Sequence, residues 1–557
     1  MKNWELVNPD LTTVSEIEEY RLGSDIQISD IEPDITNLKE SVEQTKVCIE
    51  QGMPITIVGD YDCDGITSSS ILCFGLWEYT KVKPEIIIPK RMSEGYGLNI
   101  SIIDRIPPNS LMITVDNGIS AVDQIEYAKS KHIKTIIIDH HQKRDDGVIP
   151  KADVVVDPSA EDRDCYKYYC GAGLAYRFIK ALNPESKALD YYIALAGIGT
   201  IADVMLLRGH NRYLVMESLS HIQKGNVPFG MGILLEQMKI GVDITESDYG
   251  FLIGPIFNAA GRLYDDGGQR IVNFITLDRR LVKTPTDLQM LEEEARQLIS
   301  INEERKAEVF REMEIVKSKL QETKPIIIME DNQFKKGIVG ILAGNLTEQY
   351  NVPSLVFTED TKNKDNLSGS GRSPEGLNLK ELLDKVSYFF VGYGGHEGAA
   401  GMTIKKENLK GLMDAVKTEL ADYIPKDVDV LKYNMDISGY TEEQMKELYK
   451  ETRMYAPYGE GNKPLVFRYN GFSGVPKIMG KTKSHFKIEG AGISVLGFYL
   501  ADKWEELGKP ATIDVIGTLS MNVFNGKSTP QLEIIDFRKT EIKQTAVYSD
   551  LASLFAF

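Results

Sequence analysis

With 557 residues the chain is too long for one typical domain, so we expect three or four folded units. Its net charge of −18 argues against coating of nucleic acid by bulk attraction, although a local basic groove is compatible with that charge. No apolar run approaches the ~20 residues that span a bilayer, and the acidic start lacks a secretory signal pattern, so we expect a cytoplasmic protein with no membrane partner.

Short β-branched runs alternate with amphipathic stretches after an N-terminal segment, residues 1–50. The runs cover residues 54–58, 85–89, 111–115, 134–138 and 153–156. Each run is continuously apolar, which is typical of strands buried on both faces of a parallel sheet. This order predicts a doubly wound α/β domain over residues 51–285, with a helical second half from about residue 170.

A long polar helix is predicted next, over residues 286–322. It carries charges on nearly all sides, as expected of a connector between domains. A second α/β unit follows over residues 323–425, and short strands with Gly and Asn turns then predict a small β-barrel over residues 426–540. Residues 541–557 are predicted to form a tail.

Acidic and imidazole side chains directly follow three of the predicted strands. These side chains are Asp60, Asp62, Asp64, Asp116, Asp139, His140 and His141. Ligands of open α/β sheets bind beyond the carboxyl ends of the strands, so we expect these groups to share one rim. Carboxylates so close together repel each other unless cations lie among them, and Asp and His suit Mn²⁺ while carboxylates suit Mg²⁺. The pattern therefore predicts two divalent ions and hydrolysis of a phosphoester.

Two other interpretations of the acidic residues fail. Residues 60–65 (DYDCDG) match the first half of an EF-hand loop, but Ile71 stands where an EF hand needs its glutamate. The motif also follows a strand instead of a helix. Helix capping would explain an aspartate at one strand end, but it does not explain three strand ends with paired histidines.

Four segments resemble the motifs of the DHH phosphoesterases. They are DYDCDGITSSS (60–70), TVDNGIS (114–120), IIDHHQ (137–142) and GTIADVMLL (199–207). Further segments resemble the RecJ exonucleases of that superfamily, namely FNAAGR (257–262), GSGRS (369–373), GYGGHEGAAG (392–401) and YAPYGEGNKPLVF (455–467). The resemblance extends from about residue 55 to 540. It implies a DHH catalytic domain over 51–285, a DHH-associated domain over 323–425 and a nucleic-acid-binding OB-fold over 426–540.

The resemblance implies a metal-dependent exonuclease of DNA repair and recombination. Such an enzyme degrades single-stranded DNA from the 5′ end and releases 5′-mononucleotides with two Mn²⁺ or Mg²⁺ ions. The implied metal ligands are Asp60, Asp62, Asp64, Asp116, His140 and Asp203. Asp116 would bridge the two ions, whereas spacing alone does not single out Asp203. The implied catalytic residues are Asp62, Asp64, Asp139 and His141, with His141 at the scissile phosphate and Asp139 orienting the histidine pair.

The resemblance also implies a set of substrate-binding residues. They are Arg91, Arg262, Ser370, Arg372, His396, Lys481 and Lys483. A 5′-phosphate is best held by arginine forks, so Ser370 and Arg372, with Arg91, would form a phosphate pocket. The two lysines would line a single-strand groove of the OB-fold. For any one arginine a surface ion pair is the alternative, and for His396 the alternative is a structural turn.

Two other functions stay open beside the exonuclease. One is a DHH enzyme that cleaves short oligonucleotides or cyclic dinucleotides, but such a small substrate needs no OB-like domain. The other is an inactive replication scaffold, although inactive relatives lose metal ligands that this chain retains. We expect a monomer that binds single-stranded DNA, and the candidate protein partners are a single-strand-binding protein or a helicase.

Overall fold

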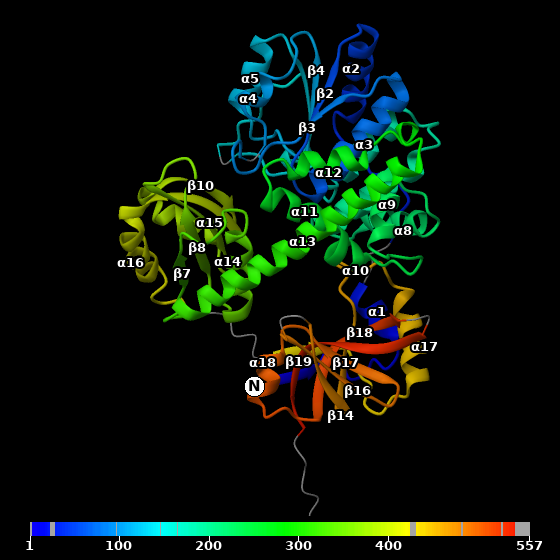
Figure 1. Cartoon of the computed structure of the whole chain (residues 1–557), viewed down its shortest axis with the longest axis vertical. Helices are drawn as coiled ribbons and strands as arrows, with labels where there is room; N and C mark the ends of the chain where they lie inside the picture. Colours follow the sequence, from blue (N-terminus) through cyan, green and yellow to red (C-terminus); the bar gives the residue numbers. More distant parts are fainter. Residues whose placement is uncertain are drawn as a thin grey trace, which may run out of the picture. The chain divides into compact units, whose positions relative to one another are not determined.

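The computed structural model describes two units of the chain (Figure 1). The described residues are 3–22, 28–95, 97–144, 146–163, 165–423, 430–480, 483–524 and 527–540. The first unit comprises Ile26–Asp427 with Gly459–Gly461, and the second comprises Met1–Asp25, Val428–Tyr458 and Asn462–Phe557. Lys481 and the predicted tail lie outside the described residues.

A five-stranded parallel sheet opens the first unit and confirms the predicted strands. Its strands are β2 (Ile55–Val58), β3 (Glu85–Ile87), β4 (Leu111–Val115), β5 (Lys134–Ile138) and β6 (Val154–Val156), in the order β3-β2-β4-β5-β6. Helices α4 (Ile100–Ile103) and α5 (Val122–Ser130) cover one face, and α3 (Cys63–Thr80) covers the other (Figure 1). Burial on both faces explains why the strand sequences are continuously apolar.

The rest of this domain is helical, as predicted. Its helices are α6 (Gly171–Leu182), α7 (Leu189–Ala202), α8 (Gly209–Gln223), α9 (Phe229–Gln237), α10 (Glu246–Asp248), η2 (Tyr249–Ile253), α11 (Gly254–Leu263) and α12 (Gly267–Ile275). Helices α6 and α7 pack on α3 and share its hydrophobic core. Helix α2 (Leu38–Glu50) also belongs to this core through Leu38, Val42 and Cys48.

The predicted connector is confirmed as helix α13 (Pro285–Lys319). Thr284 and Asp287 form a capping box at its start, and Pro285 occupies the first turn, where its missing N–H costs nothing. Although most of the helix is polar, Leu298 joins the hydrophobic core of the first α/β domain and Val316 joins a second core near the other end. The helix is therefore anchored by apolar contacts at two places.

The second core belongs to a five-stranded mixed sheet in the order β10-β11-β9-β8-β7. Its strands are β7 (Ile327–Glu330), β8 (Ser354–Glu359), β9 (Asn366–Arg372), β10 (Phe390–His396) and β11 (Ala399–Lys405). The helices of this domain are α14 (Val339–Tyr350), α15 (Leu379–Lys385) and α16 (Leu409–Glu419). This arrangement agrees with the second α/β domain expected here.

The second unit is built on a seven-stranded sheet in the order β13-β14-β18-β19-β17-β16-β15. Its elements are β12 (Val430–Tyr433), β13 (Met435–Asp436), α17 (Glu442–Arg453), β14 (Val466–Ser473), β15 (Val475–Met479), β16 (His485–Gly490), β17 (Ile493–Gly497), α18 (Ala501–Glu506), β18 (Thr512–Phe524) and β19 (Lys527–Lys539). Phe467, Phe486 and Trp504 lie in its core.

The N-terminal residues do not form a segment of their own. Strand β1 (Asn3–Leu6) pairs in parallel with β12, and Val14 and Ile17 of α1 (Val14–Leu22) enter the core of the second unit. Helix α2, by contrast, packs in the first unit. The segment predicted over residues 1–50 is thus shared between the two units, because its pairing partner lies far along the chain and leaves no local pattern.

Candidate active site

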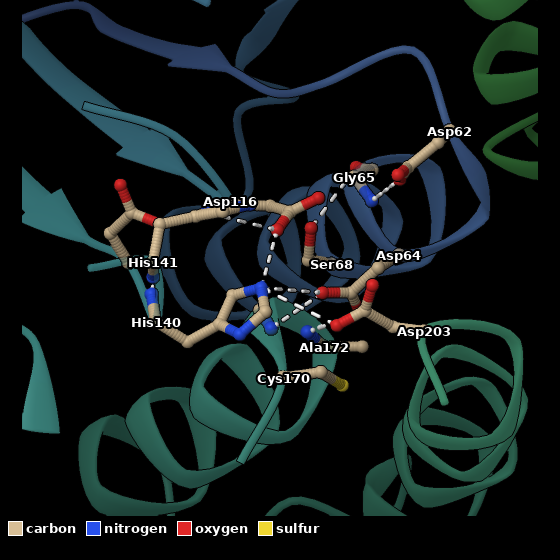
Figure 2. A network of polar contacts seen from close by, with 12 residues as sticks. Asp62, Asp64, Gly65, Ser68, Asp116, His140, His141, Cys170, Ala172 and Asp203 are labelled. Carbon is tan, nitrogen blue, oxygen red and sulfur yellow. Dashed lines mark hydrogen bonds and ion pairs between the residues drawn. The ribbon is translucent and has the colours of Figure 1, made fainter. Parts of the chain in front are cut away.

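The predicted rim exists where strands β2, β4 and β5 end (Figure 2). Asp60, Asp62 and Asp64 follow β2, and Asp116 follows β4 directly. Asp62 also caps α3, since its carboxylate accepts a hydrogen bond of 3.0 Å from the Gly65 N–H. Asp62 therefore both caps helix α3 and belongs to the acidic cluster.

Three sets of potential ligand atoms, each within 4.8 Å, lie at this rim. The sets are Asp60 with Asp62 and Asp116, Asp64 with His140 and Asp203, and Asp116 with His140 and His141. His140 Nε2 lies 3.0 Å from Asp116 Oδ1, 3.6 Å from Asp203 Oδ2 and 3.7 Å from Asp64 Oδ2. The structure thus brings together all six residues that the resemblance implies as ligands, including Asp203, which spacing alone did not indicate.

Helix α6 holds the Asp64 carboxylate at its N-terminus. Asp64 accepts hydrogen bonds from the N–H groups of Gly171 (2.6 Å) and Ala172 (2.9 Å), which α6 leaves without an intrahelical partner. There is no room for a side chain at Gly171, because a Cβ atom there would lie 2.7 Å from Asp116 Cβ and 2.9 Å from Asp64 Oδ2. Gly171 therefore sets how closely the helix approaches the cluster.

Replacement of Gly171 by alanine is expected to weaken Mn²⁺ binding by about 10-fold or more, because the new methyl group displaces two carboxylates. The measurement is a Mn²⁺ titration followed by electron paramagnetic resonance. Gly344→Ala is the matched control, since Gly344 also lies in a helix and its Cβ would meet nothing within 4 Å. Equal Mn²⁺ affinity in the two variants would show that the close contact at Gly171 is unimportant.

Asp139 fixes the orientation of the histidine pair. Its carboxylate accepts hydrogen bonds from the N–H of Ile119 (2.9 Å) and the N–H of His140 (2.8 Å), and it lies 2.8 Å from His141 Nδ1. Burial alone would raise the pKa of Asp139, but the hydrogen bond and charge of His141 hold it below its ordinary value. In turn Asp139 outweighs the effect of burial on His141 and raises the pKa of that imidazole to about 9.

The negative charges of three other carboxylates in the cluster are poorly compensated. Burial and mutual repulsion raise the pKa of Asp60 and of Asp116 well above the usual value, and they raise the pKa of Asp203 to about 8. Burial lowers the pKa of His140, so this imidazole does not supply the missing positive charge. Asp60 Oδ1 is buried with no hydrogen-bond partner among the described residues. Oxygen and imidazole donors in this state fit divalent cations.

Sequence reasoning missed Asp157, which follows strand β6. Its Oδ1 accepts hydrogen bonds from the N–H groups of Ser159 (2.9 Å) and Ala160 (3.1 Å). Burial and the charge of Asp139 raise its pKa to about 8. The signal was available, because Asp157 directly follows a predicted strand, as Asp116 does.

The three predicted substrate-binding arginines lie near one another in the first unit. The Arg91 guanidinium stacks 4.7 Å from the centre of the Tyr61 ring. Burial and the charges of Arg91 and Arg305 lower the pKa of Arg262 to about 9, and burial and Arg91 lower the pKa of Arg372. Within the described part of the chain, Arg91, Arg262 and Arg372 form no salt bridge with a carboxylate. Cations that repel each other in this way favour binding of an anion.

The remaining predicted residues are less closely associated. Arg372 Nη1 donates a hydrogen bond of 3.2 Å to Ser370 Oγ, so these two form one group on β9. His396 is exposed at the end of β10, where its Nδ1 accepts a hydrogen bond from the Gly398 N–H at 3.2 Å, and we find no contact between it and the acidic cluster in the described residues. Lys483 is exposed in the second unit, in a turn with φ of 56°.

Comparisons with known proteins agree with the fold. The family models "DHH family, N-terminal domain", "DHHA1 domain" and "RecJ OB domain" match residues 54–206, 323–422 and 435–536. The "Single-stranded-DNA-specific exonuclease RecJ" of Bacillus subtilis (strain 168) is 30% identical over 527 residues, which are 91% of this chain and 64% of that protein. The protein of the same name from Salmonella typhimurium is 30% identical over 407 residues, which are 68% of each chain.

Solved structures match as well. RecJ from Thermus thermophilus in complex with Mn²⁺ superposes with a TM-score of 0.75 at 23% identity, covering 95% of this chain and 76% of that one. An exonuclease RecJ bound to manganese superposes with a TM-score of 0.60 at 26% identity, covering 70% of this chain and 96% of that one. These matches confirm the predicted architecture of DHH, DHH-associated and OB-fold domains. The chain spans only 64% of the length of the Bacillus relative.

Proposed function

Because the chain belongs to the RecJ family of DHH phosphoesterases, we propose that it is an exonuclease specific for single-stranded DNA. It hydrolyses phosphodiester bonds from the 5′ end, releases 5′-mononucleotides and serves DNA repair and recombination. The observation that carries this proposal is the convergence of six acidic and imidazole ligands on one rim. The OB-fold domain favours long strands over dinucleotides as substrates.

Asp60, Asp62 and Asp116 would hold one Mn²⁺ or Mg²⁺ ion, and Asp64, His140 and Asp203 would hold the other. When bound, such a pair activates a water molecule and neutralises the charge of the phosphate. Asp139 keeps the His141 imidazole protonated at neutral pH. The positive charge of His141 would then stabilise the scissile phosphate. Arg262, close to Asp62 and Tyr61, would contact the DNA backbone.

The substrate test uses internally labelled, 5′-phosphorylated single-stranded DNA with Mn²⁺, beside an Asp203→Ala protein. We expect stepwise loss of nucleotides from the 5′ end, absent in the variant and absent on blunt duplex. Cleavage confined to dinucleotides would contradict the proposed substrate. Binding of long strands without cleavage would instead favour an inactive scaffold.

Arg372 is expected to recognise the terminal phosphate together with Ser370. Replacement by glutamine should raise KM for a 5′-phosphorylated strand by about 10–100-fold, since a hydrogen bond to a charged group is worth ~1.5–3 kcal/mol. The measurement compares 5′-phosphorylated with 5′-hydroxyl strands. Arg311→Gln is the matched control, because Arg311 pairs with Glu308 on α13. Equal loss on both strands would refute the phosphate role of Arg372.

The setting in which the enzyme works is part of the same proposal. Among the described helices, we find none with the length and apolar character needed to cross a membrane. The enzyme acts as a monomer in the cytoplasm, and a single-strand-binding protein or a helicase would deliver its single-stranded substrate.

A further inference from the structure

A short segment from the C-terminal part of the chain packs against the loop that carries Asp203. Gly459–Gly461 belongs to the first unit, although the residues on both sides of it belong to the second. The carbonyl oxygen of Glu460 accepts a hydrogen bond of 2.8 Å from the Leu207 N–H. We call residues 459–461 the strap and residues 203–208 the Asp203 loop.

At Gly459 and Gly461 the strap lies too close to its neighbours to carry a side chain. A Cβ atom at Gly459 would lie 2.8 Å from Leu207 Cδ1 and 3.3 Å from Ile201 Cδ1. Gly461 has φ of +77°, and a Cβ atom there would lie 3.1 Å from Leu206 Cδ2. The strap backbone therefore packs directly on side chains of the loop, which is possible because glycine has no side chain.

The rest of the Asp203 loop is held from the other side. Tyr166 donates a hydrogen bond of 2.7 Å to the Arg208 carbonyl oxygen, and Asn211 Nδ2 donates one of 3.1 Å to the Leu206 carbonyl oxygen. Val204 has φ of 55°, a conformation unfavourable for a β-branched residue, so surrounding contacts must impose it. Leu207 is fully buried, and without the strap its N–H would lack this partner.

We propose that the strap is a positioning segment for the metal ligand Asp203, an inference that rests on the metal site of the proposed function. Asp203 Oδ2 lies 3.6 Å from His140 Nε2 in the set formed with Asp64. A metal site tolerates little displacement of a ligand, so movement of the loop weakens this set. The set of Asp60, Asp62 and Asp116 contains no residue of the loop and keeps its affinity.

The strap is in turn shaped by the residues around it. Asn462 is buried, and its Nδ2 donates hydrogen bonds to the carbonyl oxygens of Tyr455 (3.0 Å) and Pro457 (2.8 Å). These bonds close the turn that presents the strap. The strap thereby adjusts the affinity of one of the two metal sites without contributing a ligand to either.

The test titrates Mn²⁺ into the full chain and counts bound ions by electron paramagnetic resonance. Gly459→Val should leave one ion bound as in the parent protein and weaken the other by about 10-fold or more. Asn462→Ala, which adds no bulk, should act in the same direction by a smaller factor. Gly241→Val is the control, because a Cβ atom at Gly241 meets nothing within 4 Å and its φ is not left-handed.

Activity provides a second readout that a general folding defect would not reproduce. In Gly459→Val the Mn²⁺ concentration for half-maximal hydrolysis should rise by about the same factor of 10, while kcat at saturating Mn²⁺ recovers. Unchanged Mn²⁺ binding in both Gly459→Val and Asn462→Ala, or equal weakening of both ions, would overturn the inference. Failure of the parent protein to bind two Mn²⁺ ions would instead overturn the proposed metal site, and the inference with it.

Discussion

Replacement of Asp116 by asparagine is expected to reduce DNA hydrolysis by about 10³-fold or more while making the metal-free protein more stable. Asp116 belongs to two of the three ligand sets, so its loss affects both metal positions. The same carboxylate is buried among like charges, which raises its pKa well above the usual value. Removing the charge relieves this repulsion, so the free energy of unfolding of the metal-free variant should exceed that of the parent.

The measurement pairs a single-turnover hydrolysis assay with chemical unfolding in the presence of a chelator. Asp422→Asn is the matched control, because Asp422 is exposed and has no hydrogen bond or ion pair within the described residues. This control should change neither quantity. An Asp116→Asn protein that is inactive but also less stable than the parent would contradict the electrostatic explanation.

Mn²⁺ affinity is expected to rise between pH 6 and 9. Asp60, Asp62 and Asp116 have raised pKa values, and that of Asp203 is about 8, so protons compete with the metal at neutral pH. Binding should therefore release at least one proton per chain at pH 7. Calorimetric titration in buffers of different ionisation enthalpy measures this release, and an affinity that does not change with pH would contradict it.

The same groups give the metal-free protein an unusual pH dependence of stability. A carboxyl group whose folded pKa exceeds its unfolded value of ~3.9 contributes stability at low pH, and that contribution is lost as the pH rises toward the folded pKa. His141 acts in the same direction, since its pKa is raised to about 9. The free energy of unfolding should thus fall from pH 5 to 9, and Mn²⁺ at 100 times Kd should restore ~2.7 kcal/mol per site.

Much of the acidic rim was predictable, because its residues follow apolar strands that are readable one by one. Asp116 comes directly after β4, Asp60 and His140 come one residue later after β2 and β5, and parallel strands end at a common edge. The position of Asp203 at the rim could not be predicted in this way. It ends a helix whose approach to the rim is a tertiary property, so only resemblance to a known motif identified it.

Other features depend on contacts that no local pattern encodes. The pairing of β1 with β12 and the contact of Glu460 with Leu207 join residues far apart in the sequence. The grouping of Arg91 with Arg262 and Arg372 arises in the same way, because their segments are brought together only by the folded domains. Each arginine viewed alone could have been a surface residue.

The most direct test of the central claim is a crystal of the protein grown with Mn²⁺ and measured at the manganese absorption edge. We expect two anomalous peaks ~3.5–4 Å apart, one among Asp60, Asp62 and Asp116 and the other among Asp64, His140 and Asp203. Fully occupied Mn²⁺ peaks elsewhere in the protein, with no peak at this rim, would contradict the proposed metal site.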